Sequence, residues 1–321
     1  KIHPFLFMKD SDEFSFLKET FKSLGSQYFD TSGIIIGPGD DAGLVENNKE
    51  TIYSVDASVS GIHFPENLSP DLIAYRSVST AASDIAACGG SLKWILISLT
   101  VNNKDLSWMR SFVSGLKNFS DDYSCPVLGG DLTKGAQENI SVTACGELNK
   151  ENFLRRGGAK EGDLIFLTGT LGQAKKGLEL IKENMAQIDL TSNFVKKFLS
   201  PKLNFEFAAE LSCIANSCID VSDGLISDLG HILEASKVGG EINVEKISLV
   251  GEVEDALTWG DDYELLMTIS PDKKTSLLEI SERYDVEISE IGKITREPDL
   301  RVIENGSLVS FSKSGYNHFN E

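Results

Sequence analysis

Short aspartate clusters, each beside a glycine or another small residue, recur along the chain and constrain its fold more than any other feature. They are Gly39-Asp40-Asp41, Ser54-Val55-Asp56, Ser83-Asp84, Gly129-Gly130-Asp131, Asp220-Val221-Ser222-Asp223-Gly224 and Gly260-Asp261-Asp262. Mg²⁺ takes oxygen ligands and binds through a few carboxylates plus substrate phosphates, and glycine lets the backbone approach a polyphosphate closely. The pattern therefore predicts an enzyme that handles phosphates.

Composition restricts the class of protein and its partners. With 321 residues, 41% of them hydrophobic, the chain is long enough for a buried core and favours two domains. A formal net charge of −19 repels nucleic acid and anionic membrane surfaces, so neither is an expected partner. Five scattered cysteines without a Cys-x-x-Cys pair favour reduced thiols in a cytoplasm. No apolar run reaches a membrane span of about 20 residues, and the mixed start 1–7 is too short for a signal peptide.

The N-terminal region is expected to begin with an amphipathic helix and short strands. Residues 33–37 read as a buried strand that delivers Gly39-Asp40-Asp41 to a loop. Residues 43–45 and 51–55 read as a hairpin that ends at Asp56. Asp41 and Asp56 are therefore expected to converge from neighbouring strand ends.

Helices and strands alternate through the rest of the first half. Ser69 as N-cap and Pro70 at the first position predict a helix that runs to Ala87, with Asp84 in its last turn. The segments that follow are a strand at 94–101, a helix at 106–119, a strand at 125–128 leading into Gly129-Gly130-Asp131, and a strand at 140–146.

A boundary between domains is expected within the polar segment 149–162, which predicts domains at 8–148 and 149–321. The second half then opens with a strand at 163–168 and a helix at 174–182, joined by Thr168-Gly169-Thr170-Leu171-Gly172. Helices at 204–215 and 223–235 flank a strand at 218–221. Acidic residues thus lie at strand-to-helix turns in both halves.

The turn at 220–224 is a candidate ligand site. Asp220 and Asp223 lie three residues apart around Ser222, so both carboxylates and the hydroxyl can face one ligand. The helix N-terminus is expected to add free N–H groups there. The alternative for Asp223 is an ordinary helix N-cap.

Familiar nucleotide-binding motifs are absent from the sequence. In Gly37-Pro38-Gly39-Asp40-Asp41-Ala42-Gly43 the third glycine is one residue late for a dinucleotide fingerprint, and a strand is expected to follow. Two adjacent aspartates repel a bare pyrophosphate, so this loop suits a metal ion better, or is simply a polar turn. Neither a P-loop nor the protein-kinase motifs occur. Charge neutralisation is therefore expected to come from several metal ions.

Two other residues allow both a functional and an ordinary explanation. His63, in a loop after Ser60-Gly61-Ile62, is either a catalytic base or a surface or hydrogen-bonding residue. Arg156, before Gly157-Gly158, can clamp a phosphate with its planar guanidinium or can be a solvated linker charge.

Read in order, seven motifs and a closing segment resemble the thiamine-monophosphate kinase family over almost the whole chain. They are Gly39-Asp40-Asp41-Ala42, Ser54-Val55-Asp56 through Gly61-Ile62-His63-Phe64, Ser83-Asp84-Ile85-Ala86-Ala87, Gly129-Gly130-Asp131-Leu132-Thr133-Lys134-Gly135, Thr168-Gly169-Thr170-Leu171-Gly172, Asp220-Val221-Ser222-Asp223-Gly224-Leu225, Gly260-Asp261-Asp262-Tyr263-Glu264-Leu265 and Gly315-Tyr316-Asn317-His318-Phe319. Any one motif can arise by chance, whereas the ordered set is specific. The wider ATP-binding superfamily includes aminoimidazole ribonucleotide synthetase, selenophosphate synthetase and a hydrogenase maturation protein.

The resemblance implies a fold class that combines α/β and α+β. An N-terminal α/β domain contributes strands to a β-barrel across a homodimer, and a C-terminal α+β domain follows. The resemblance also implies several Mg²⁺ ions as cofactors, with ATP as co-substrate and thiamine monophosphate as acceptor.

The same resemblance implies roles for individual residues. Positions that hold magnesium are Asp41, Ser54, Asp56, Asp84, Asp131, Asp220 and Asp223, and of these Asp84, Asp131 and Asp223 are the expected catalytic residues. Positions near ATP are Gly130, Asp131, Arg156 and Ser222. Positions near thiamine monophosphate are His63, Asp261 and Tyr316. Without the resemblance, Tyr316 would be interpreted as a core aromatic and Asp261 as a turn residue.

Three positions depart from the family pattern. Val55 stands where Thr is expected, Ala81 where Asn is expected, and Asp261 where Glu is usual. Valine offers no hydroxyl ligand, although its backbone carbonyl can still serve. The shorter Asp261 reaches about one carbon less far toward the substrate.

The implied reaction is direct in-line transfer of the γ-phosphoryl group of ATP to thiamine monophosphate. Because the acceptor is already an ionised phosphate oxygen, metal bridging and positioning matter more than a general base. One alternative is another ATP-dependent enzyme of the superfamily that activates an amide or a selenium nucleophile; none of the first 35 residues is the cysteine expected for the latter. A second alternative is a non-catalytic protein that binds nucleotide or metal.

Overall fold

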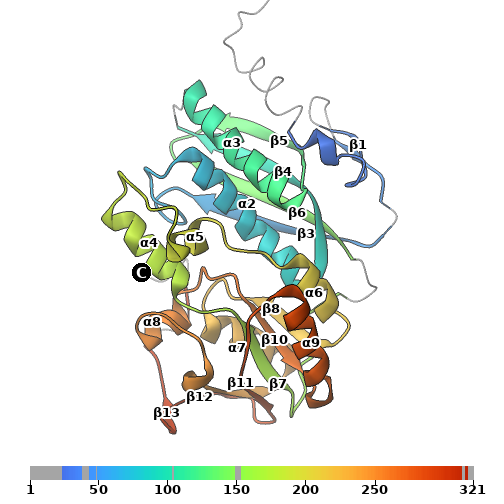
Figure 1. Ribbon diagram of the computed structural model, residues 1–321, viewed down its shortest axis with the longest axis vertical. Helices are drawn as coiled ribbons and strands as arrows, with labels where there is room; N and C mark the ends of the chain where they lie inside the picture. The colour runs from blue at the N-terminus through green and yellow to red at the C-terminus, as the bar shows by residue number, and fades with distance from the viewer. Residues whose placement is uncertain are drawn as a thin grey trace, which may run out of the picture. The chain divides into compact units, whose positions relative to one another are not determined.

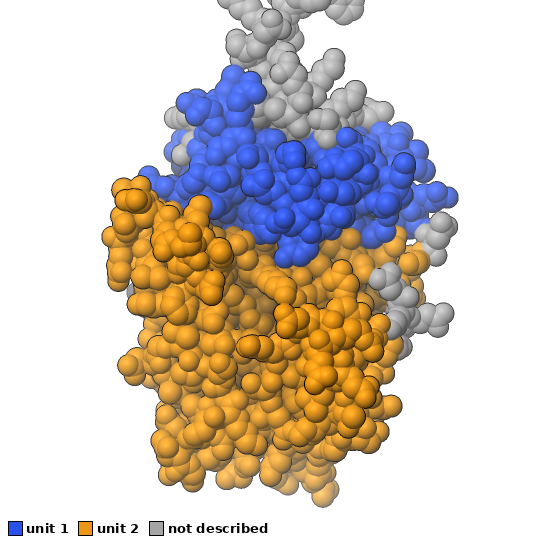
Figure 2. Space-filling model, viewed as in Figure 1, with its two compact units in different colours: residues 1–48, 55–78, 93–144 blue, residues 49–54, 79–92, 145–321 orange. Residues whose placement is uncertain are grey.

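The computed structural model describes residues 24–37, 43–47, 49–102, 105–148, 153–312 and 315–316 (Figure 1). Its contacts divide the chain into two compact units, coloured separately in Figure 2. The first unit comprises 1–48, 55–78 and 93–144, and the second comprises 49–54, 79–92 and 145–321. The predicted domain division at 148–149 stays a prediction.

A small two-stranded sheet lies in the first unit. Strand β1 (Ile34–Ile36) pairs antiparallel with β2 (Leu44–Val45). The predicted hairpin between 43–45 and 51–55 is therefore wrong, because the earlier strand takes the hydrogen bonds of β2. Burial of the whole β1 strand is also wrong, since Ile34 is buried but Ile35 is 62% exposed.

The next sheet has four strands in the order β3-β6-β4-β5. They are β3 (Thr51–Val59), β6 (Asn139–Leu148), β4 (Gly90–Val101) and β5 (Val127–Lys134). Asp56 lies within β3 and not at its end, because the strand continues to Val59. The strand predicted at 125–128 is instead β5, which continues through 129–131 to Lys134 and pairs in parallel with β4.

Helices α2 (Pro70–Ala87) and α3 (Leu106–Tyr123) confirm the two helices predicted for this half. Asp105 caps α3, because its side chain accepts a hydrogen bond from the backbone N–H of Trp108 at 2.9 Å. The helices touch closely at Gly115, where an added Cβ would lie 2.0 Å from the carbonyl oxygen of Asp71. The absence of a side chain at Gly115 permits this contact.

The second unit is built on a seven-stranded sheet with the order β13-β12-β9-β11-β7-β10-β8. The strands are β7 (Leu164–Thr168), β8 (Ala215–Asp220), β9 (Gly239–Asn243), β10 (Leu265–Ile269), β11 (Ile288–Thr295), β12 (Leu300–Glu304) and β13 (Ser307–Val309). Neighbouring strands of this sheet pair antiparallel, except that β12 pairs in parallel with β9. Chain order and spatial order differ, so this sheet brings distant segments side by side.

In the part of the chain that the structure describes, the second unit also contains helices α4 to α9, labelled in Figure 1. They are α4 (Gln173–Glu183), α5 (Asn193–Leu199), α6 (Phe205–Leu211), α7 (Leu225–Ser236), α8 (Val253–Thr258) and α9 (Lys274–Tyr284). The apolar side of α7, including Leu225, Leu229 and Ile232, packs into the same buried cluster as Ile165 and Ile219 of the sheet. Helix α7 is thereby held directly after β8, where the candidate turn lies.

The state of the cysteines and the polarity of the helices were also expected from the sequence. All five cysteines are free thiols. Within the described ranges, every helix is too short or too polar to span a membrane.

Replacing Gly115 by alanine should destabilise the protein although alanine favours helices. The new Cβ would meet backbone 2.0 Å away, and such overpacking costs about 1–3 kcal/mol. Gly230→Ala in α7 is the matched control, because nothing lies within 4 Å of its added Cβ and the helix should gain about 0.8–1.0 kcal/mol. Urea denaturation measures both, and equal shifts for the two variants would refute the close contact.

Candidate active site

Two acid–hydroxyl pairs form the centre of the site in the second unit. The Ser83 hydroxyl, near the end of α2, donates to the Asp220 carboxylate at the end of β8, 2.6 Å away. The Ser54 hydroxyl of β3 donates to the carboxylate of Asp84, next in sequence to Ser83. Asp220 and Ser83 are 3% and 1% exposed, so this pair lies inside the protein, whereas Ser54 and Asp84 are half-buried.

Asp84 and Arg156 act on the buried carboxyl group of Asp220 with charges of opposite sign. Burial and then the charge of Asp84 raise the pKa of Asp220, while the Ser83 hydrogen bond and the Arg156 charge lower it. Burial, Asp84 and Asp220 likewise raise the pKa of the nearby Cys88 thiol to about 11. Both shifts report an excess of negative charge in a poorly solvated space.

A hard divalent cation fits this donor set. Asp84 and Asp220 supply carboxylate oxygens, Ser54 and Ser83 supply hydroxyls, and the raised pKa of Asp220 shows that added positive charge would be favourable. These are the oxygen donors that Mg²⁺ prefers, whereas Cys88 remains a protonated thiol at neutral pH.

The turn between β8 and α7 is organised by a residue that the sequence did not single out. One oxygen of Asp228 accepts the backbone N–H groups of Ser222, Asp223 and Gly224 at 3.0, 3.1 and 3.2 Å. An internal carboxylate thus accepts the N–H groups of the turn, whereas the helix begins at Leu225, and the expectation of free N–H groups at its N-terminus stays a prediction. The alternative of Asp223 as N-cap is wrong, since Gly224 precedes the helix and no side chain caps it.

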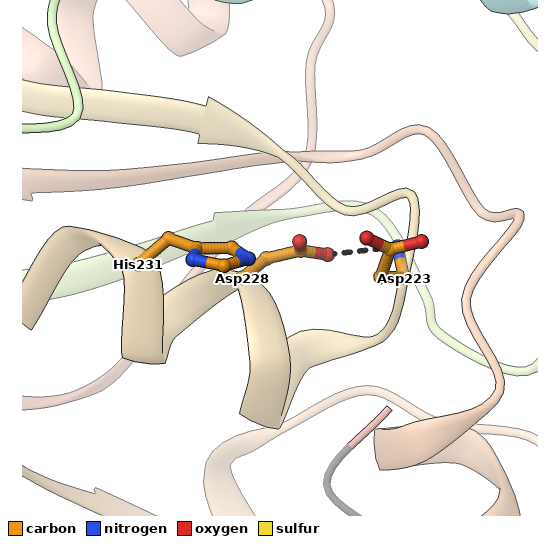
Figure 3. Close-up of side chains that lie close together, drawn as sticks. All are labelled: Asp223, Asp228 and His231. Atoms are coloured by element: carbon orange, nitrogen blue, oxygen red, sulfur yellow. Dashed lines mark hydrogen bonds between the residues drawn. The ribbon is translucent and has the colours of Figure 1, made fainter. Parts of the chain in front are cut away.

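Asp223, Asp228 and His231 lie together on this turn and on α7 (Figure 3). Their potential ligand atoms all fall within 4.8 Å of one another. Burial, followed by the charges of Asp220 and Asp223, raises the pKa of Asp228 to about 8. The acidic site thus extends from Asp220 along the turn.

Two distant segments join the same turn through its carbonyl groups. Asp261 donates its N–H to the carbonyl of Ser222, and Tyr316 donates its N–H to the carbonyl of Asp223, both at 2.9 Å. Tyr316 is 47% exposed, so its interpretation as a core aromatic is wrong. The structure therefore brings Asp261 and Tyr316 to the turn that carries Asp220, Ser222 and Asp223.

Asp262 fixes the second glycine-rich turn in a similar way. Its buried carboxylate accepts the N–H groups of Gly172 and Ala174, at the start of α4, at 2.6 and 3.0 Å. The next acid, Glu264, accepts from the Thr168 hydroxyl and pairs with Lys197. Protein carboxylates, and not a ligand, therefore accept these groups of the turn at 168–172.

The remaining predicted residues belong to the first unit and are described within it. Gly130 and Asp131 lie on β5, and an added Cβ at Gly130 would come 2.1 Å from the Ile97 carbonyl, which explains the glycine by strand pairing. Asp56 accepts the N–H of Ala57 at 2.8 Å. The Nδ1 atom of His63 accepts the Val59 N–H at 3.0 Å, so a neutral ring carries its proton on Nε2. Asp41 lies outside the described residues.

The structure explains one family departure and locates another. Side chains alternate along β3, so Val55 faces away from Ser54 and Asp56, and its side chain is 66% exposed. The valine therefore removes no hydroxyl from the face that carries those two oxygen donors. Ala81 is fully buried in α2.

Sequence reasoning missed Ser83, Asp228 and Asp262 as organising residues. Asp228 carried a detectable signal, because acids are favoured in the first turn of a helix. Asp262 is distinguished from its neighbour Asp261 only by burial, which the sequence Asp261-Asp262 does not reveal.

Both halves of the chain match models of known protein families. Residues 39–148 match the family AIR synthase related protein, N-terminal domain, and residues 160–305 match AIR synthase related protein, C-terminal domain. A thiamine-monophosphate kinase of Buchnera aphidicola subsp. Schizaphis graminum is 36% identical over 96% of this chain and 99% of its own length. The chain belongs to the thiamine-monophosphate kinase family.

Solved structures agree with this assignment. The thiamine-monophosphate kinase of Stenotrophomonas maltophilia K279a has a TM-score of 0.82 and 29% identity, covering 92% of this chain and 97% of that chain. AaThiL complexed with AMPPCP and TMP has a TM-score of 0.73 and 29% identity, covering 99% of this chain and 100% of that chain. The mixed α/β architecture is thus shared over nearly the full length.

Titration of Asp262 should make folding stability fall as the pH rises. Burial raises the pKa of Asp262 from 3.8 to about 6. Between those values the unfolded chain loses its proton while the folded protein keeps it, so ionisation favours the unfolded state. Asp262→Asn cannot titrate, and from about pH 4 to about pH 7 its unfolding free energy should decline less than that of the wild type, by at most about 3 kcal/mol. Urea denaturation in chelator measures this, and an identical decline in both proteins would argue against a raised pKa.

Proposed function

We propose that the protein transfers the γ-phosphoryl group of ATP to thiamine monophosphate and releases thiamine diphosphate and ADP. One observation carries the proposal: two acid–hydroxyl pairs, one of them buried, lie together in a chain that matches thiamine-monophosphate kinases over nearly its full length. The related structure of AaThiL complexed with AMPPCP and TMP supports ATP as donor and thiamine monophosphate as acceptor. These matches favour this reaction over the amide- or selenium-activating alternatives and over a non-catalytic binder.

The proposed chemistry is a single in-line displacement. A phosphate oxygen of thiamine monophosphate forms the new bond to the γ-phosphorus of ATP, and the bond from that phosphorus to the β,γ-bridging oxygen breaks. Because the attacking oxygen is already ionised, no proton must be removed and no covalent enzyme intermediate is needed. The task of the protein is to hold two anions in line against their repulsion.

Several Mg²⁺ ions are proposed as cofactors. When bound, they would neutralise phosphate charge and polarise the transferred group. Asp84 and Asp220 with their serine partners, together with Asp223, would hold metal in the second unit. Asp41, Asp56 and Asp131 are proposed as further ligands. Gly130, Arg156 and Ser222 are proposed to line the ATP site.

The acceptor side is proposed to include Asp261, Tyr316 and His63. Support for the first two comes from their backbone bonds to the same turn as Ser222 and Asp223. The exposed ring of Tyr316 offers a face to a thiazolium cation, an interaction of about 0.5–2 kcal/mol. Asp261 can offset the same positive charge.

Two domains and a cytoplasmic location are also proposed. The two family matches support domains at 8–148 and 149–321. A cytoplasmic protein without nucleic-acid or membrane partners is supported by the net charge of −19 and the free cysteines.

Turnover should depend strictly on a hard divalent cation. The purified protein should convert ATP and thiamine monophosphate to thiamine diphosphate with Mg²⁺ or Mn²⁺, because the carboxylate and hydroxyl donors described above suit such ions. Chromatography of the products measures the reaction. Full turnover in excess chelator would disprove the metal sites, and no thiamine diphosphate under any metal would disprove the function.

Tyr316→Ala should raise the Michaelis constant for thiamine monophosphate several-fold more than that for ATP. The reason is the loss of the exposed ring face, while the backbone bond to Asp223 remains possible. Phe311→Ala is the matched control: this aromatic residue of the same C-terminal segment packs against the core cluster and should affect stability without that selectivity. Equal changes in both constants for Tyr316→Ala would place the acceptor pocket elsewhere.

A homodimer that joins N-terminal strands into a β-barrel is also proposed. The supporting observation is that β3 exposes Tyr53 and Val55, which are 57% and 66% exposed, on one face of the strand. Contiguous exposed apolar side chains mark interaction sites, and an obligate interface buries more than about 1,600 Å².

Light scattering should therefore report a dimer at micromolar concentration. Val55→Asp should shift the protein toward monomer by placing a charge in the interface. Leu308→Asp, at a residue that is 62% exposed on β13, serves as control and should leave the dimer intact. A monomeric wild type would contradict the proposed assembly.

A further inference from the structure

The backbone of the turn after β8 is bonded on both its donor and acceptor sides. The N–H groups of Ser222, Asp223 and Gly224 donate to one oxygen of Asp228. The carbonyls of Val221, Ser222 and Asp223 accept from Tyr263, Asp261 and Tyr316 at 2.9 Å each. The N–H of Val221 donates to the Glu264 carbonyl at 2.7 Å.

This bonding leaves side chains as the groups that the turn can offer to a ligand. A turn between a strand and a helix commonly binds phosphate through its backbone N–H groups. Here Asp228, only 1% exposed, accepts three of them in place of a phosphate. Asp220, Ser222 and Asp223 are then presented from a backbone with a fixed conformation.

We infer that Asp228 is a positioning residue for the metal–nucleotide side of the site. It acts through the three N–H groups that it accepts, which set the directions of Ser222 and Asp223. It is assigned a positioning role and not a catalytic one, because its bonded oxygen accepts three backbone N–H groups of the turn. The inference rests on the proposed function where it is tested by the Mg²⁺ requirement of turnover. The hydrogen-exchange test described below does not depend on that function.

Asp228→Asn tests this role, since the neutral amide is a weaker acceptor for three converging N–H groups. The assay is run above about pH 8, where Asp228 is ionised, because hydrogen bonds to a charged group are about twice as strong as those to a neutral amide. Their partial loss should then have a measurable cost. The Mg²⁺ concentration for half-maximal turnover at saturating substrates should rise roughly ten-fold, a change of about 1.4 kcal/mol. The Michaelis constant for thiamine monophosphate should change less than about two-fold.

Asp163→Asn is the matched control for a merely structural effect. Asp163 is also buried, 3% exposed, and accepts the Lys160 N–H at 2.9 Å and the Asn216 amide at 2.8 Å. Its loop carries no candidate ligand, so the variant should lose stability without a change in the Mg²⁺ requirement. The same Mg²⁺ shift in both variants, or no shift in Asp228→Asn, would overturn the positioning role.

Hydrogen exchange on the wild-type protein supplies a test that does not depend on the variant's folding or on any activity. The amides of Ser222, Asp223 and Gly224 should be protected without ATP and Mg²⁺, and adding both should change their exchange little. Protection that appears only with nucleotide and metal would show that the ligand, and not Asp228, orders the turn. If the wild type makes no thiamine diphosphate, the proposed function fails, while this exchange result still decides whether Asp228 fixes the turn.

Discussion

The hydrogen bonds from three consecutive backbone N–H groups to one buried carboxylate, that of Asp228, hold together the part of the protein on which the rest of the site depends. A buried carboxylate is costly unless its oxygens are bonded, and a buried N–H without an acceptor is costly as well. Here the Asp228 carboxyl group provides the acceptor for the three N–H groups, and they provide its donors. The carbonyls on the other side of the turn are then available to Asp261, Tyr263 and Tyr316, which ties two later segments to the end of β8.

At two turns the protein's own carboxylates accept the backbone N–H groups. Asp262 accepts two N–H groups at the start of α4, as Asp228 does at the turn before α7. In contrast, Asp84 and Asp220 accept hydroxyl hydrogens and retain a mutual repulsion that a cation would relieve. The acids therefore fall into two groups: those that bond the backbone and those that suit a metal. With metal ions held by the second group, a chain with a net charge of −19 would offer positive charge to two anionic substrates.

The sequence predicted the parts of this arrangement that depend on local pattern. Ser69 and Pro70 located the start of α2, and Asp220 and Asp223 were placed correctly at a strand-to-helix turn. The sequence did not predict strand pairing between distant segments. Strand β2 pairs with β1 and not with β3, and Gly130 lies within a strand, where the backbone of Ile97 on the neighbouring strand leaves no room for a side chain. The roles of Asp228 and Asp262 could not be predicted because they depend on which acid becomes buried. Burial follows from a sheet order that places β8, β10 and β7 side by side although they are far apart in sequence.

A crystal structure with Mg²⁺, a non-hydrolysable ATP analogue and thiamine monophosphate would test the central claim most directly. The account predicts metal density at the carboxylates of Asp84 and Asp220, with the N–H groups of Ser222, Asp223 and Gly224 still bonded to Asp228. Phosphate oxygens accepting those N–H groups, with the Asp228 side chain displaced, would contradict it.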